Sequence, residues 1–170
     1  MHLAHLGIAV FIIGVTMVKG YETEKDVKMG PGDTVEVGGY QFTLLGVREA
    51  KGPNYIALIG DVDVTKNGRP YRRMTPEKRI YKASGMPMTE TAIDSGLLRD
   101  LYISLGEPID RRNPGGEWAV RVYHKPFVGW IWGGCLLMSL GGFVSICDRR
   151  YRVRATAAAT PSATQPAQSA

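Results

Sequence analysis

The segment FVGWIWGGCLLMSLGGFVSIC, Phe127–Cys147, carries no charged side chain over about 21 residues. As a helix it would be about 30 Å long, which matches the hydrocarbon core of a bilayer. Trp130 and Trp132 lie near its start, and indole rings favour the headgroup region of a membrane. The segment therefore predicts a transmembrane helix, and it makes the chain a membrane protein.

A second apolar run, LAHLGIAVFIIGVTMV, occupies Leu3–Val18. It gives about 24 Å of helix, slightly less than a bilayer core, although the amine of Lys19 can reach the interface. A secretory signal peptide is the alternative, but no Lys or Arg precedes the run and no small-residue cleavage site follows it. We therefore expect another transmembrane helix, one that continues a longer membrane protein.

The segment after Cys147 is strongly basic. It reads DRRYRVR, Asp148–Arg154, and such an excess of arginine is typical of a cytoplasmic flank. Two spans then place the residues between them in the periplasm of a bacterium. The terminal ATAAATPSATQPAQSA predicts a disordered cytoplasmic tail. The expected order is a transmembrane helix (1–20), a periplasmic β domain (21–125), a transmembrane helix (126–147), and a basic flank with its tail (148–170).

The region between the apolar runs has the alternation and the β-branched content of strands. The candidate strands are TVEV (Thr34–Val37), YQFTLLGV (Tyr40–Val47), YIALIGDVDV (Tyr55–Val64), KRIYKA (Lys78–Ala83) and EWAVRVYHK (Glu117–Lys125). Gly38–Gly39 and Asn67–Gly68 are typical hairpin turns. Thr91–Gly106 fits either a short helix or another strand. We expect a small, mostly-β domain of about five to seven strands, either a sandwich or a compact barrel of the oligonucleotide/oligosaccharide-binding type.

His5 is the one histidine inside the first apolar run. An ionisable side chain in a membrane span is costly and indicates a function, and neutral imidazole is a common axial ligand of haem iron. The alternative is a histidine that bonds to a neighbouring helix or lies close enough to the surface to be hydrated. His2 lies on the same helical face, but axial ligands approach iron from opposite sides. His2 and His5 therefore cannot hold one iron between them, and a second ligand must come from another helix.

The middle domain offers weaker candidates. Four basic side chains there could attract a haem propionate or an acidic partner, although a solvated charged face is the more ordinary interpretation: Arg72, Arg73, Lys78 and Arg79. His124, at the edge of the second span, is expected to be an exposed surface residue. Met86 and Met88 could bind haem iron but are expected in the core. The sequence shows no nucleophile–base set, phosphate loop or zinc spacing, so we do not expect a free-standing enzyme.

Several longer motifs follow one another along the chain. They are LAHLGIAVFIIGVT, GPNY, PEKRIY, MPMTETAIDSGLLRDLYISLGEP, WAVRVYHKPFVGWIWGGCLLMSLGG and DRRYR, and together they extend from Leu3 to Arg152. In this order they resemble the C-terminal part of the CcmF family, the haem-lyase membrane subunits of bacterial cytochrome c maturation.

This resemblance implies a multi-pass inner-membrane protein that receives haem from the chaperone CcmE and, with CcmH, attaches it to apocytochrome c. It also implies a b-type haem in the membrane, with one axial ligand at the position of His5 and none at His2. Members of the family are several times longer, and their other b-haem ligand lies upstream of the matched part. The expected cofactor is therefore haem b, shared with an upstream portion of the same lyase.

The partners expected from the resemblance are this upstream portion, CcmE, CcmH, apocytochrome c and the membrane, with no nucleic acid. We do not expect the chain to be catalytic by itself. The competing hypothesis is a membrane-anchored periplasmic module for binding or assembly, without haem.

Overall fold

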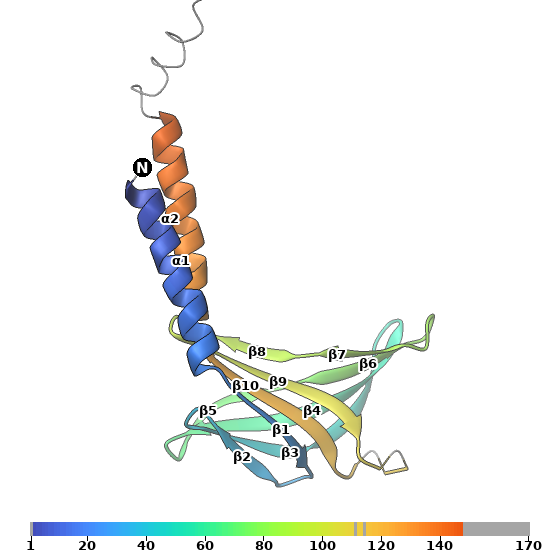
Figure 1. Ribbon diagram of the computed structural model, residues 1–170. Helices are drawn as coiled ribbons and strands as arrows, with labels where there is room; N and C mark the ends of the chain where they lie inside the picture. Colours follow the sequence, from blue (N-terminus) through green and yellow to red (C-terminus); the bar gives the residue numbers. More distant parts are fainter. Residues whose placement is uncertain (1, 111, 114, 148–170) are drawn as a thin grey trace, which may run out of the picture. The chain divides into compact units, whose positions relative to one another are not determined.

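The computed structural model describes residues 2–110, 112–113 and 115–147. Helix α1 (His2–Tyr21) precedes ten strands, and helix α2 (Val128–Cys147) follows them (Figure 1). The chain divides into two compact units, Met1–Ile13 with Trp130–Ala170 and Gly14–Gly129. The basic flank and the tail that we expect at 148–170 lie outside the described residues.

The strands form two antiparallel sheets within the second unit. They are β1 (Thr23–Met29), β2 (Thr34–Val37), β3 (Tyr40–Lys51), β4 (Tyr55–Lys66), β5 (Arg69–Met74), β6 (Glu77–Tyr81), β7 (Pro87–Glu90), β8 (Ala92–Ser95), β9 (Arg99–Pro108) and β10 (Trp118–Pro126). One sheet has the order β1-β10-β9-β8, and the other has the order β2-β3-β4-β6-β7, with β5 also paired to β4 (Figure 1). The prediction of a mostly-β domain is confirmed, and it is a sandwich with more strands than expected. The ambiguous segment Thr91–Gly106 forms strands β8 and β9.

The core of the sandwich lies between the two sheets and follows the period of two. In β3, Phe42 and Leu44 are buried, and the residues that alternate with them are not. Trp118 of β10 faces them from the other sheet and is fully buried. A buried aromatic side chain of this size contributes several kcal/mol of hydrophobic stabilisation, about 25 cal/mol for each Å² removed from water. Alternation therefore sets which side chains form the core.

Two tight turns fix the register of the second sheet. Gly38 and Gly39 connect β2 to β3 with φ angles of 59° and 76°, and Asn67 and Gly68 connect β4 to β5 with φ angles of 52° and 71°. Positive φ at both central positions is the geometry of a type I′ hairpin, which glycine and asparagine adopt with the least strain. Both predicted hairpins are confirmed.

The chain enters and leaves the sandwich on neighbouring strands. Strand β1 follows α1, β10 precedes α2, and the two strands pair antiparallel, with Thr23 opposite His124 and Met29 opposite Trp118. The ends of these strands that connect to the helices therefore lie at the same end of one sheet.

Helices α1 and α2 approach each other closely within the first unit. A Cβ atom on Gly134 would lie 2.6 Å from the backbone N of Phe11, and one on Gly7 would lie 2.6 Å from the backbone N of Met138. Glycines allow such backbone contact between membrane helices. Gly133 does not take part in this contact, because a Cβ atom on it would meet nothing within 4 Å.

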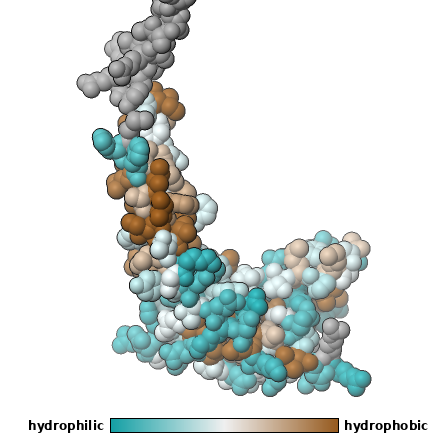
Figure 2. All heavy atoms as spheres, viewed as in Figure 1, coloured by the Kyte–Doolittle hydropathy of each residue, from teal (hydrophilic) through white to brown (hydrophobic). Residues whose placement is uncertain are grey.

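Both helices are long and apolar enough to cross a membrane. Only 17 % of the apolar window of α1 and 11 % of that of α2 is buried, whereas the core helix of a soluble protein would be mostly buried. Figure 2 shows apolar side chains on the surface of the helices and many hydrophilic ones on the surface of the sandwich. The helices therefore need an apolar surrounding that this chain does not provide.

Candidate functional sites on helix α1 and in the sandwich

His5 lies on the side of α1 that faces away from α2. Ala4, Gly7 and Phe11 lie where glycines of α2 come closest to α1, and they share one stripe of the helix. At about 100° per residue, His5 is rotated by roughly 130° from the middle of this stripe, and its side chain is exposed. His5 is therefore turned away from the stripe of α1 that meets the glycines of α2.

The face of α1 that carries His5 is suited to a flat, apolar group. Ala9, Ile12 and Thr16 follow His5 at the spacing of one helical stripe, and all are exposed. Ala9 has only a methyl group one turn from the imidazole, so a porphyrin ring bound to His5 would meet little steric hindrance there. One imidazole suits one axial position of haem iron. Among the described residues there is no group of three or more His, Cys, Asp or Glu side chains that could hold a metal ion.

A polar cluster connects the two sheets at one end of the sandwich. Six side chains from β3, β4, β5, β8 and β9 form it, and we call it the inter-sheet cluster: Tyr40, Lys66, Tyr71, Arg72, Asp94 and Arg99. Arg99 Nε donates to Tyr40 Oη over 2.9 Å, and Arg99 Nη1 donates to Asp94 Oδ2 over 2.8 Å. The Arg99–Asp94 bond lies within one sheet, whereas the Arg99–Tyr40 bond joins the two sheets. Tyr71 and Arg72 of β5 also donate across to Asp94 of β8, so the cluster holds the sheets together.

The charges of the cluster are set by burial and by its cations. Burial raises the pKa of Asp94, but hydrogen bonds from Arg99 and Arg72 outweigh it, and the pKa ends below its ordinary value. Burial likewise raises the pKa of Tyr40, and hydrogen bonds from Lys66 and Arg99 bring it below its ordinary value. Asp94 is therefore ionised at neutral pH and sits 3 % exposed beside two arginines.

His124 adjoins this cluster and is half-buried, so the expectation of an exposed surface residue is wrong. Its ring packs against the backbone of Gly38, where a Cβ atom would overlap the imidazole, and lies 6.2 Å from the ring of Tyr40. Burial lowers the pKa of His124, and the charges of Arg99 and Lys66 lower it further. The structure therefore gives His124 the role of a neutral packing residue.

Replacing Asp94 with Ala is expected to lower the free energy of unfolding of the sandwich by about 3 kcal/mol, because it leaves the half-buried Arg99 without its anion. Guanidinium denaturation in detergent, followed by circular dichroism, measures this free energy.

The stabilisation by Asp94 depends on pH, because the folded-state pKa of its carboxyl is depressed. The stabilisation is present above the ordinary carboxyl pKa of about 3.9 and is lost as the pH falls through the folded-state value. The matched control is Asp26→Ala, since the exposed Asp26–Arg121 pair contributes little. An equal loss in both variants would contradict the prediction.

The four basic candidates of the middle domain all have acidic partners. Arg72 pairs with Asp94, Arg73 with Asp63, Lys78 with Glu107, and Arg79 with Glu77. Lys78 is only 7 % exposed and also donates to the carbonyl O of Gly106 over 3.1 Å, so the prediction of a solvated face is wrong for it.

The methionine candidates are also placed differently from the expectation. Met86 and Met88 are 68 % and 53 % exposed, so the prediction that they belong to the core is wrong. Met86 lies in the turn between β6 and β7, and Met88 lies in β7, a short strand in which no residue is fully buried.

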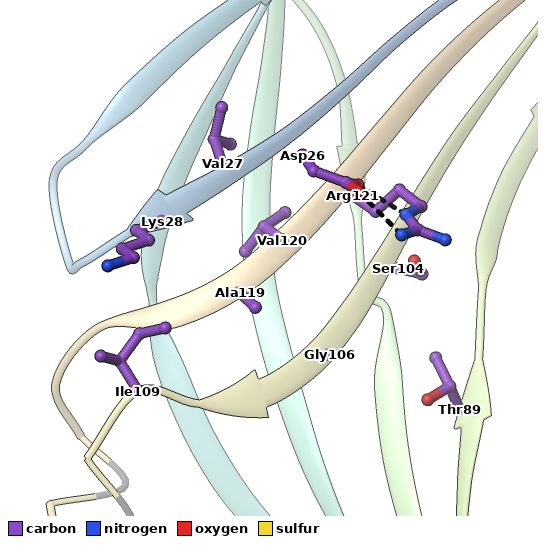
Figure 3. A pocket seen from close by; sticks show the side chains of 10 residues that line it. All are labelled: Asp26, Val27, Lys28, Thr89, Ser104, Gly106, Ile109, Ala119, Val120 and Arg121. Atoms are coloured by element: carbon purple, nitrogen blue, oxygen red, sulfur yellow. Dashed lines mark hydrogen bonds and ion pairs between the residues drawn. The ribbon is translucent and has the colours of Figure 1, made fainter.

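A shallow hollow of about 550 Å³ lies over strands β1, β9 and β10 (Figure 3). Asp26 and Arg121 form one wall and neutralise each other through bonds of 2.5 and 2.7 Å. None of the ten residues that line it is a histidine or a cysteine, and its one carboxylate, Asp26, is paired with Arg121.

Comparison with known proteins gives a consistent result. Residues 20–126 match the family described as the CcmF C-terminal beta-sandwich. The chain is 50 % identical over 154 residues to a cytochrome c-type biogenesis protein CcmF of Pseudomonas aeruginosa and 47 % identical over 154 residues to that of Escherichia coli, which covers 91 % of this chain in both alignments.

A solved structure named cytochrome c heme lyase CcmF matches 82 % of this chain with a TM-score of 0.66 and 18 % sequence identity, which supports the fold. This chain spans 23 % of the length of the curated relatives and 23 % of the solved chain. The two apolar helices, together with these relatives, support a location in a membrane.

Proposed function

Because this chain belongs to the CcmF family, we propose that it forms the C-terminal part of a haem lyase that acts in cytochrome c biogenesis. Its share of the assembly is two membrane helices and the β-sandwich between them. The sandwich lies in the periplasm, and both helices cross the inner membrane of a bacterium.

The proposed contribution of α1 is one axial ligand, His5, to a b-type haem in the membrane. The exposed imidazole of His5, within an apolar helix and turned away from the stripe that meets the glycines of α2, carries this proposal. The second axial ligand then comes from the portion that precedes this part in the longer relatives. A haem bound in this way supplies a one-electron centre that can keep the iron of a substrate haem reduced.

The sandwich is proposed to face CcmE, CcmH and apocytochrome c. It supplies a surface whose two sheets are joined at one end by the inter-sheet cluster. In the hollow over β1, β9 and β10 the one carboxylate, Asp26, is neutralised by Arg121. We therefore assign to the sandwich a role in positioning partners, and the covalent chemistry takes place elsewhere in the assembly.

A split complementation experiment tests this function. The chain and the preceding membrane portion of a relative are expressed from separate genes in a bacterium that lacks its own CcmF. Together they are expected to restore covalent haem on a c-type cytochrome, measured by haem staining of a denaturing gel, whereas neither is expected to do so alone. Full maturation by the preceding portion without this chain would overturn the proposal.

A further inference from the structure

The turn between β8 and β9 carries two adjacent, strongly exposed leucines. Leu97 is 87 % exposed and Leu98 is 59 % exposed. Gly96 N donates to Arg99 O over 2.9 Å and lies 3.1 Å from Asp100 Oδ1, to which it also donates. The backbone of this turn is therefore held in place, although the two leucine side chains extend away from the core.

The leucine turn lies against the first residues of α2, within the same compact unit. Phe127 N, just before the helix, donates to Leu98 O over 2.8 Å. A Cβ atom on Gly129 would lie 2.7 Å from Leu97 O, so glycine at this position allows the turn to touch the helix backbone. These contacts fix the leucines at the level of the first turn of α2.

That level is the edge of the hydrocarbon core. Lys125 is the last charged residue before the apolar segment, and Trp130 and Trp132 follow within the first turns of α2. Interfacial lysine and tryptophan side chains mark the boundary between headgroups and acyl chains. A turn attached to the helix at this boundary is adjacent to lipid on any side that protein does not cover.

We propose that Leu97 and Leu98 insert into the lipid interface beside α2, so that the sandwich rests on the bilayer through this turn as well as through its two helices. Removing a leucine side chain from water is worth about 1.5–3 kcal/mol, so two side chains give a substantial anchor. Lipid is favoured over a protein partner because the turn is hydrogen-bonded to the residue just before α2, at the level where the apolar helix begins.

The inference depends on the proposal that α2 crosses the membrane. It does not depend on haem binding by His5 or on the side of the membrane that the sandwich occupies.

The experiment uses the full chain reconstituted in vesicles of phosphatidylethanolamine and phosphatidylglycerol. Cys135 and Cys147, which are free thiols, are replaced by Ser, and Leu97→Cys carries an environment-sensitive fluorophore. Lipids spin-labelled near the headgroup are expected to quench the label at least about two-fold, and aqueous iodide is expected to quench it little, because the label is in the shallow part of the bilayer. Circular dichroism verifies the β-sheet signal of each labelled variant.

The matched control is Ile109→Cys in the same background. Ile109 is 46 % exposed and follows the opposite end of β9, about 30 Å along the strand from the leucine turn. Its label is expected to be quenched by iodide and not by the spin-labelled lipids.

A label on Cys135, with only Cys147→Ser, tests separately whether α2 lies in the bilayer. Lipid quenching at Cys135 without quenching at Leu97→Cys would overturn the inference and leave the membrane span intact. Protection of the Leu97→Cys label from both quenchers would show that protein covers the turn, which also overturns it. If the lipids did not quench the label on Cys135, the result would instead contradict the membrane placement of α2.

Discussion

Replacing His5 with Ala is expected to remove most of the b-type haem from the chain assembled with the preceding membrane portion. The variant loses one of the two axial ligands of the proposed site, and the methyl group of Ala cannot bind iron. Loss of a supporting residue around a metal commonly weakens its binding 10- to 100-fold, so loss of the ligand itself is expected to cost at least about 10-fold. The reduced-minus-oxidised absorption spectrum of the purified assembly measures the effect.

Two variants of the same helix serve as controls for this spectrum. His2→Ala removes an exposed imidazole three residues earlier and is expected to leave the spectrum unchanged. His5→Gly is expected to regain haem absorption when imidazole is added, because the free ligand can occupy the vacated position. A full b-type spectrum in His5→Ala would assign the ligand to another residue. If the assembly with the unaltered chain contained no haem, the alternative of a membrane-anchored assembly module would be favoured.

Replacing Gly134 with Ala is expected to destabilise the helix pair strongly for so small a change. The added methyl would lie 2.6 Å from the N and 2.7 Å from the Cα of Phe11, and backbone atoms cannot move aside as a flexible side chain can. The helices must separate, and overpacking of this kind typically costs about 1–3 kcal/mol. A lower midpoint of thermal aggregation for the chain in mild detergent reports this loss.

The same Gly→Ala change at other glycines of α2 serves as the control. Gly133→Ala and Gly142→Ala place the same methyl where nothing lies within 4 Å, so both variants are expected to keep the midpoint of the unaltered chain. Gly141→Ala is expected to behave like Gly134→Ala, since its methyl would lie 2.5 Å from the backbone N of Ala4. Equal midpoints for all four variants would show that α1 and α2 do not pack through these glycines.

The helices and the central strands could be predicted because each carries its own signal. An uninterrupted apolar run marks α2, and alternation marks β3 and β4. Strand β1, TEKDVKM, was not predicted, since only Val27 and Met29 turn toward the core and the other side chains are polar. Strand β5, RPYRRM, was missed for a similar reason, because Met74 is its one buried residue.

The candidate sites also differ in how clearly the sequence indicates them. His5 stands out in the sequence because an imidazole is unusual among apolar side chains. The inter-sheet cluster has no such signal, since Tyr40, Asp94 and Arg99 are ordinary polar residues that only the pairing of the strands and the stacking of the sheets bring together. The position of His124 could not be inferred either, because the space for its ring is created by the missing side chain of Gly38, far away in the sequence.

The pairing of Thr23 with His124 has a consequence for how such a protein can be altered. Cross-strand partners lie about 5 Å apart, so both connections to the helices leave the sandwich through one narrow ribbon. The distance between the two points where the sandwich connects to the helices is thus independent of the size of the domain between them. We therefore expect that the sandwich can be replaced by a smaller or larger domain. A replacement that begins and ends in two paired strands would connect to the same two helices without forcing them apart.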